Sequence, residues 1–533
     1  MKKKRTVFII VAVLAVVMSI LAYSANRYLP GLLHRLVKDK VASLRTKGIA
    51  IEYDSLQLSL WRNRVTVDTL SLAIAEKNIS AKIFGLHVHS LRLLPLLFHK
   101  RVHLKELGID SVSVLMNVSS KKDTVQKDET RKNDLSFIVD NYSVQHLLIR
   151  IRDSVANDTL TLRGSIAVTG FSVNDGPVPW SFGAVQTDSL LVVQSYYIFQ
   201  VDHLDLDRER KYIHLDTLRI KPRYSKSEHA RRKRVEDDRF HGMITGLVAE
   251  GLDFEWSDSS FVNASLLKFS FALDIYRNKH YPFPKRTYMP LPVDALKKLP
   301  FDLNLDTLRI YNSAVSYEEV GEEADSSGTV YFKKLQAGIF HISTDTTLRA
   351  PYMEASALFM GSGKLAITCQ FSNTKKPAVL KGSLSDFPLQ KMNDMLKPQV
   401  KMQVESGVMT KLNFNFKFND YRSDGIVDIS YKDLKLTGLK QDKEKKDKAV
   451  KNNLLTLAIN TFIKNDAGRF VTGSKQTGII LFYRDRKKAI FNYWWKSLFS
   501  GLKSSFSLRV KADKDQVKVL AKKDVEKRKR RKE

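Results

Sequence analysis

Apolar and polar residues alternate along most of the chain from Gly48 onward. Segments such as "VTVDTLSLAI" from Val65 and "TKLNFNFKF" from Thr410 place every second side chain on one apolar face. A period of two indicates strands with one dry face and one wet face, and therefore mostly antiparallel pairing. Helical patterns are few and short, as in "PVDALKKL" from Pro292. The pattern predicts a mainly β protein built on a long, mostly antiparallel sheet.

A hexapeptide interrupts this alternation at intervals. "LDTLRI" occurs at Leu215 to Ile220 and again at Leu305 to Ile310, and across its Asp-Thr step the apolar residues are three apart instead of two. In a continuous strand this slip would turn the second half of the strand to the other face. A β-bulge restores the face and bends the strand, whereas a two-residue hairpin needs a positive φ that β-branched Thr tolerates poorly. We favour the bulge, and repeated bulges are predicted to curl the sheet around an elongated apolar groove.

The predicted groove is lined by apolar residues that flank the repeats or lie on a later strand. These residues are Leu56, Leu58, Val67, Leu70, Leu72, Leu215, Leu218, Ile220, Leu305, Leu308, Ile310, Phe414 and Phe416. So long an apolar face must be covered, and the chain offers few helices to cover it. A second sheet that forms a sandwich is one solution, and bound acyl chains are the other.

The N-terminus predicts a membrane anchor. "MKKKR" precedes an uncharged apolar run from Thr6 to Ala25, which is long enough to cross a bilayer core of roughly 20 residues. The anchor side chains are Val7, Ile10, Val13, Leu14, Val17 and Leu21. A cleaved signal peptide is the alternative, but the run exceeds the usual apolar core of such signals. The basic residues before the run favour a cytoplasmic N-terminus and a single pass, with the bulk of the chain on the far side.

The formal net charge of +31 indicates an anionic partner, either nucleic acid or a lipid surface. No nucleic-acid-binding motif accompanies the basic runs, so no nucleic-acid partner is expected. Near the C-terminus, "RKKAIFNYWWKSLFSGLKSSF" combines aromatic residues and lysines at helical spacing, which suits a membrane interface. A helix that closes the end of the sheet is the alternative. The candidate interface residues are Ile490, Trp494, Trp495, Leu498, Leu502 and Phe506.

Catalytic and metal-binding patterns are missing from the sequence. "GSGK" at Gly361 to Lys364 lacks both the first Gly and the Ser or Thr of a phosphate loop. His87, His89, His99 and His103 could hold zinc, but histidines on the wet face of a strand are far more common. Cys369 is the single cysteine, so no intramolecular disulfide can form. We therefore expect no enzyme, no cofactor and no metal.

The predicted organisation follows these patterns. In order, its parts are a basic stub and transmembrane anchor (1–25), a juxtamembrane helix (26–47), the first part of the β-groove (48–275), a Pro- and aromatic-rich linker (276–292), the second part of the β-groove (293–483), the amphipathic helix (484–506) and a basic disordered tail (507–533).

The order of the N-terminal segments resembles a known family. An apolar helix is followed by "SLQLSL", "VTVDTLSLAI" and then "LLPLLFHKRVHLKELGIDSVSV" from Leu93 to Val114. This order is similar to the AsmA-like family of bacterial envelope proteins, best over the first hundred or so residues and more loosely afterwards. The resemblance implies a long β-sheet with an apolar groove, located in the periplasm and active in lipid traffic and outer-membrane homeostasis.

Two hypotheses follow. In the first, an inner-membrane protein with its bulk in the periplasm binds and conducts phospholipid between the envelope membranes, with a periplasmic or outer-membrane protein as partner at the far end. In the second, an anchored β-sandwich serves as a scaffold or adhesin without lipid transport. The sequence names neither the lipid, nor the direction and energy source of transport, nor the oligomeric state.

Overall fold

A computed structural model of the chain describes residues 38, 41–42, 45, 48–59, 63–75, 78–92, 101–118, 136–153, 158–173, 180–255, 260–285, 288–374, 376–441, 449–451 and 476–505. The predicted anchor, Phe506 and the basic tail lie outside this range. Within the described part of the chain, none of the helices is both long enough and apolar enough to span a bilayer. Of the predicted juxtamembrane segment, the four described residues Lys38, Val41, Ala42 and Arg45 are helical.

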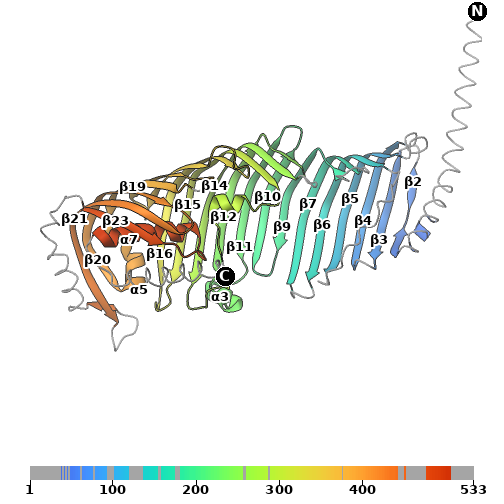
Figure 1. Cartoon of the computed structure of the whole chain (residues 1–533). Helices are drawn as coiled ribbons and strands as arrows, with labels where there is room; N and C mark the ends of the chain where they lie inside the picture. The colour runs from blue at the N-terminus through green and yellow to red at the C-terminus, as the bar shows by residue number, and fades with distance from the viewer. Residues whose placement is uncertain are drawn as a thin grey trace, which may run out of the picture. The chain divides into compact units, whose positions relative to one another are not determined.

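The alternating pattern forms strands, as predicted, and the fold is mainly β with mostly antiparallel pairing (Figure 1). The chain divides into two units, of which unit 1 is 1–225 with 240–269 and unit 2 is 226–239 with 270–533. The strands that begin in unit 1, or at its edges, are β1 (Ile49–Asp54), β2 (Gln57–Ser59), β3 (Arg64–Ile74), β4 (Ile79–Arg92), β5 (Arg101–Val118), β6 (Ser136–Asp153), β7 (Asp158–Val173), β8 (Trp180–Ser181), β9 (Ala184–Val193), β10 (Tyr197–Asp207), β11 (Tyr212–Pro222), β12 (Asp238–Glu250), β13 (Asp253–Glu255) and β14 (Phe261–Asn278).

Unit 2 adds further strands and several short helices. Its elements are α3 (Lys226–Lys233), α4 (Pro292–Leu296), β15 (Asp302–Val320), β16 (Ser327–Ser343), β17 (Tyr352–Phe359), β18 (Gly363–Gln370), β19 (Ala378–Pro388), the 3-10 helix η1 (Leu389–Met392), α5 (Asn393–Val400), β20 (Met402–Phe418), β21 (Arg422–Gln441), β22 (Ala449–Lys451), β23 (Gln476–Tyr483) and α7 (Ile490–Ser505).

One pair of strands departs from the antiparallel rule. β5 and β6 run parallel, with Arg101 opposite Ser136 and Val118 opposite Asp153. Two parallel neighbouring strands need a crossover connection that returns the chain to the end at which the first strand began, and a tight hairpin cannot provide it.

The hexapeptide does not form the predicted bulge. In β11 the register with β10 is the same on both sides of the repeat, because Thr217 faces Asp202 and Leu215 faces Leu204. A bulge would have shifted this register by one residue. The bulge prediction is therefore wrong for this copy, and the curl that we derived from bulges loses its basis.

Neighbouring strands instead take the same interruption at the same level. The register places Asp216 of β11 opposite His203 of β10 on one side and opposite Gly246 of β12 on the other. His203 (φ 49°) and Gly246 (φ 59°) both have left-handed backbones. Since both partners slip together, the pairing stays in step and the apolar residues three apart remain on one face. The second copy behaves alike, with Asp306 opposite His341 (φ 60°).

The same pairing of an Asp with a left-handed residue recurs near the N-terminus. Asp68 of β3 and Asp110 of β5 both face Gly85 of β4, which has φ 63°. A Cβ atom on Gly85 would lie 2.0 Å from Asp110 Oδ2, so the carboxylate fills the space that any larger residue would need. The Asp of the repeat thus lies opposite a residue with a left-handed backbone on the neighbouring strand. At position 85 this residue is Gly, which adopts a positive φ easily and leaves room for the Asp110 carboxylate.

The boundary between the units differs from the predicted linker. The division falls between Phe269 and Ser270, inside β14, and the predicted linker 276–292 lies within unit 2. Its aromatic residues pack onto the C-terminal part of that unit, where Tyr288 Oη donates to Asp420 Oδ1 at 3.2 Å. Tyr288 thus anchors the segment to its own unit.

The segment 226–239, which includes α3, also belongs to unit 2 although its sequence neighbours belong to unit 1. Arg277 of β14 fixes it, because the guanidinium donates to Asp238 at 2.5 Å and to Glu236 at 3.2 Å. The backbone N–H of Glu236 donates to the carbonyl oxygen of Pro282 at 2.9 Å. Charge-assisted hydrogen bonds of this kind hold the inserted segment against β14.

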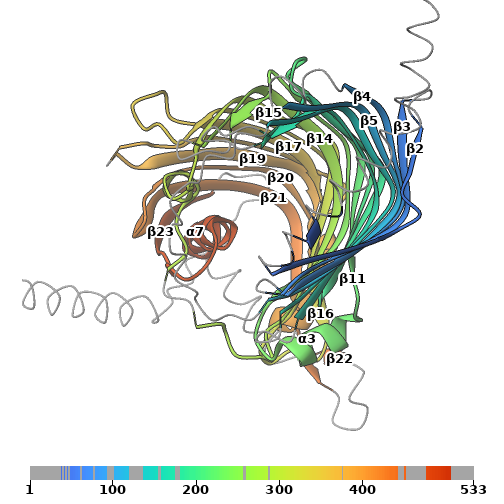
Figure 2. The same cartoon turned by 90° about the vertical axis from the view of Figure 1, so that its right-hand side faces the viewer.

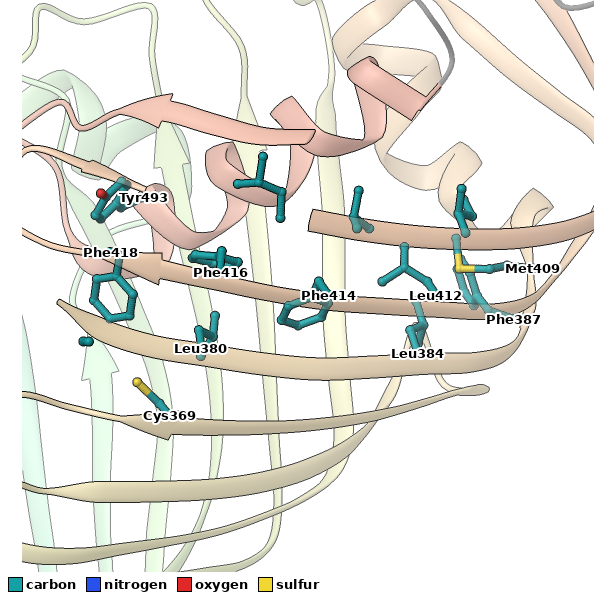
Figure 3. Packing of buried hydrophobic residues seen from close by; sticks show 14 of the residues in the cluster. Cys369, Leu380, Leu384, Phe387, Met409, Leu412, Phe414, Phe416, Phe418 and Tyr493 are labelled. Atoms are coloured by element: carbon teal, nitrogen blue, oxygen red, sulfur yellow. The ribbon is translucent and has the colours of Figure 1, made fainter. Parts of the chain in front are cut away.

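The main packed core of the described residues lies in unit 2 (Figure 3). Fifteen buried residues form one cluster, which includes Phe414, Phe416 and Phe418 on alternate positions of β20. Cys369 belongs to the same cluster, and burial raises the pKa of its thiol to about 12. The thiol is therefore protonated at neutral pH and packs as a small apolar side chain.

Helix α7 completes this core. Figure 2 shows it beside β21 and β23, and Tyr493 on its inner side is fully buried against Phe418, with ring centroids 6.0 Å apart. The backbone N–H groups of Ile479 and Leu481 on β23 donate to the hydroxyls of Ser504 and Ser500 at 3.1 and 3.3 Å. These serines satisfy donors of β23 that would otherwise be available to another strand.

Replacing Gly478 with Ala is expected to loosen α7, because a Cβ atom there would lie 2.0 Å from the backbone oxygen of Gly501. Overpacking against backbone typically costs about 1–3 kcal/mol. Hydrogen–deuterium exchange on the full chain should show faster exchange across α7. Gly108→Ala is the matched control, since its Cβ would meet no atom closer than 3.8 Å. Unchanged protection of α7 in the Gly478 variant would contradict the close packing.

Candidate functional site

Two rows of apolar side chains cross the strands of unit 1, and together we call them the apolar face. One row lies on each side of the level at which the alternation is interrupted, where Asp216 faces His203 and Gly246. The registers connect each member to its neighbour in the row, with Gly164 of β7 completing the first row. The first row is Tyr53, Leu70, Ile83, Val112, Leu147, Gly164, Leu190, Val201, Leu218 and Ile244. The second contains Val67, Leu86, Ile109, Val144 and Ile166 on β3 to β7, and Leu204, Leu215 and Leu247 on β10 to β12.

The apolar face is only partly shielded from solvent. Val67, Ile109, Val112, Val144 and Leu215 are buried, whereas the other side chains of both rows are half-buried. The one packed cluster on it consists of three buried residues, against fifteen in unit 2. From Gly48 on, the described elements of unit 1 are strands with their turns. Side chains shield one another along the rows without being enclosed.

The face carries no charge. Both rows contain apolar residues, one tyrosine and one glycine, and on β9 the second row is continued by the uncharged, buried Thr187, opposite Leu204. Tyr142 lies beside the second row among the side chains packed on the small cluster. Burial raises the pKa of the Tyr142 hydroxyl, as expected for a phenol in apolar surroundings. An uncharged, half-shielded surface of this kind gains free energy when apolar groups cover it.

Polar residues occupy the intervening positions. His87 Nε2 lies 3.3 Å from Asp110 Oδ2, His103 Nε2 lies 2.8 Å from Asp140 Oδ1, and His89 accepts from Arg64 at 2.8 Å. Each of these three histidines therefore has its own separate partner. Across the described residues, no three His, Cys, Asp or Glu side chains come together in a group that could hold a metal ion. His99 lies outside the described range.

The predicted groove residues are divided between two environments. Val67, Leu70, Leu215 and Leu218 lie on the apolar face. Leu72 and Ile220 lie two residues beyond the first row, on β3 and β11. Leu56 follows β1 and is half-buried. The backbone of Leu58 pairs with Val65. Leu305, Leu308 and Ile310 form the corresponding positions of β15 in unit 2, opposite Ile342, Ile339 and Ala337.

Phe414 and Phe416 are a correction. Their side chains are 7% and 1% exposed and belong to the packed cluster of unit 2, where the protein's own residues surround them (Figure 3). Alternation identifies the dry face of β20 but does not tell whether another element covers it. Only the fold of α7 and β23 onto this part of the sheet distinguishes these phenylalanines from the residues of the apolar face.

The predicted interface helix exists as α7, but its predicted face points inward. Ile490, Trp494, Leu498 and Leu502 pack against the cluster of unit 2, in agreement with the alternative that a helix closes this end of the sheet. Of the candidates, Trp495 is exposed, at 44%. Phe491 and Phe499, which are not among the candidates, are exposed as well.

Comparison with known proteins gives no relatives, since no family model and no curated protein matches the chain.

Proposed function

We propose that the chain is a membrane-anchored periplasmic protein that binds phospholipid along the apolar face of unit 1 and conducts it between the envelope membranes, contributing to outer-membrane homeostasis. The observation that carries this proposal is the pair of apolar rows that cross the strands of unit 1 and whose side chains are mostly half-buried. The resemblance of the N-terminal segments to the AsmA-like family and the apolar run at Thr6 to Ala25 support the same function.

The energetics need no specific chemistry. Each methylene that leaves water for an apolar surface gains about 0.8 kcal/mol, so a phospholipid with two acyl chains binds through its tails alone. The rows run across the strands, and a chain lying along them meets similar side chains at every step. A surface that offers similar apolar contacts along its length lets the lipid move along it, which is what conduction requires.

We expect Leu218→Asp to reduce lipid contact with unit 1 by about tenfold, because the row would then present a charge to the acyl chains. The measurement is cross-linking of the full chain to a phospholipid with a photoactivatable acyl chain, followed by mapping of the labelled peptides. Leu218 is half-buried, so the variant should keep its fold.

Met243→Asp is the matched control, since Met243 is 42% exposed and lies one position from the row residue Ile244, on the other face of β12. Its cross-linking should equal that of the unaltered chain. Equal labelling of the unaltered chain and the Leu218 variant would argue against the apolar face as the lipid path.

The scaffold hypothesis has one observation in its favour, the closed core of unit 2. If unit 1 were closed in the same way by a partner protein, Leu218→Asp would abolish that association and no lipid would be labelled in the unaltered chain. The cross-linking experiment therefore separates the two functions.

A further inference from the structure

The outward side of α7 carries an aromatic stripe. Phe491, Trp495 and Phe499 are spaced four residues apart and are 74%, 44% and 37% exposed. Residues four apart share one side of a helix. Trp495 and Phe499 stack on each other, with ring centroids 6.0 Å apart and an interplanar angle of 18°. The opposite side of α7 is buried in the core, so this stripe is a second apolar surface that the core leaves uncovered.

Lysines flank the stripe. Lys503 Nζ lies 4.8 Å from the ring centroid of Phe499, and Lys496 lies seven residues earlier, on the same flank of α7. The pKa of Lys496 is lowered, first by burial and then by the positive charges of Lys279, Lys488 and Lys503, whereas Glu319 acts in the opposite direction. Three other ammonium groups thus act on Lys496.

The carboxylate in this cluster is already engaged. Glu319 accepts from Lys279 Nζ at 2.5 Å and from the hydroxyl of Tyr317 at 2.6 Å. Lys488 lies 5.2 Å from the ring centroid of Phe283. For Lys496, no hydrogen bond or ion pair is formed with another described residue. Positive charge therefore exceeds negative charge next to an exposed apolar surface, which is the complement of an anionic amphiphile.

Single-stranded nucleic acid also binds aromatic and basic side chains, but it uses ring faces as stacking platforms. Here Trp495 and Phe499 turn a face toward each other, and Lys503 covers the ring of Phe499. Ring edges and the exposed side of Phe491 remain, and these contact aliphatic chains well. The geometry favours an acyl chain over a stack of bases.

We propose that the outward stripe of α7 and its flanking lysines form a binding site for an anionic phospholipid, with the acyl chain along Phe491, Trp495 and Phe499 and the phosphate at Lys496 and Lys503. This inference rests on the proposed function and adds to it a lipid class and a second site in unit 2. The site selects a net negative headgroup, whereas the apolar face of unit 1 has no charge with which to select one.

The test is quenching of tryptophan fluorescence in the full chain by phospholipids with brominated acyl chains, presented in mixed detergent micelles. Phosphatidylglycerol should quench at about fivefold lower concentration than phosphatidylcholine, a preference of the size expected for two charge contacts near a surface. Trp495→Phe should remove this difference. Trp494→Phe should retain it, because Trp494 packs in the core 6.0 Å from Phe418.

The double variant Lys496→Gln and Lys503→Gln should bind both lipids equally. Lys487→Gln is the matched control, since Lys487 is an exposed lysine in the turn before α7 and should leave the preference unchanged. Equal quenching by the two lipids in the unaltered chain would overturn the inference. The inference would also be overturned if a short oligonucleotide displaced phosphatidylglycerol while Trp495→Phe left the phosphatidylglycerol quenching unchanged.

The two proposals fail separately. Lipid cross-linking to unit 1 with no headgroup preference at Trp495 would leave the proposed function standing and remove the α7 site. Absence of lipid from both would remove both.

Discussion

Asp420→Ala is expected to destabilise unit 2 by about 3–5 kcal/mol, because removal of one partner of a buried ion pair leaves the other charge unpaired. The side chain of Arg484 is fully buried and pairs with Asp420, and its guanidinium also donates to the carbonyl oxygen of Met289 at 2.5 Å. Arg486 donates to the same carboxylate at 2.6 Å. Asp420 therefore joins the segment before α7 to the segment that contains Met289, and two cations depend on it.

Hydrogen–deuterium exchange of the full chain measures this loss in β20, β21 and β23, where the free energy of local unfolding should fall. Asp424→Ala is the matched control, since Asp424 is 54% exposed and lies 3.7 Å from Arg422, which is also 54% exposed. An exposed pair of this kind contributes about 0–1 kcal/mol. Equal effects of the two variants would show that Asp420 acts as another surface carboxylate and not as the centre of a buried network.

Phe416→Ala is expected to cost about 3–5 kcal/mol of stability, the range typical of large aromatic residues removed from a core. Phe416 is 1% exposed and lies between Phe414 and Phe418 on β20, each with its ring centroid 6.2 Å away. The sequence alone placed Phe416 in a ligand groove. A groove residue would lose ligand contact when truncated and leave the fold nearly unchanged, so the variant discriminates between the two positions.

Chemical denaturation with exchange detection provides the measurement, and Phe84→Ala provides the control. Phe84 is a strand phenylalanine of β4 that is 44% exposed, and its truncation should change stability by about 0.5 kcal/mol or less. A similarly small change for Phe416→Ala would be inconsistent with the packed cluster.

The strands illustrate how much could be predicted locally. Alternation near Val65 and Thr410 became β3 and β20, and the short helical pattern from Pro292 became α4. These segments were predictable because side-chain direction along a strand or helix depends on the neighbouring residues in sequence. The division between the units lies inside β14 and not at 276–292. Tyr288 and Met289 find their partners at Asp420, Arg484 and Arg486, far away in the chain, and local sequence does not report such contacts.

The hexapeptide was read correctly as an interruption and incorrectly as a bulge. The spacing of Leu215 and Leu218 shows that one strand slips, but a register belongs to two strands. Only the pairing shows that His203 and Gly246, opposite Asp216, slip at the same level. No signal within one hexapeptide reports the backbone conformation of its neighbour, although the glycines opposite Asp68 and Asp216 are a trace of it.

The amino-acid sequence by itself determined which side of each strand is apolar and that a helix rich in aromatic residues follows β23, since both properties depend on the periodicity of adjacent residues. The tertiary structure decided which apolar sides are covered. In unit 2, α7 and the strands beside it enclose Phe416, whereas the rows through Leu218 in unit 1 stay half-exposed, and α7 retains an aromatic stripe after burying its other side. Burial depends on contacts between residues distant in the chain, and periodicity carries no information about those contacts.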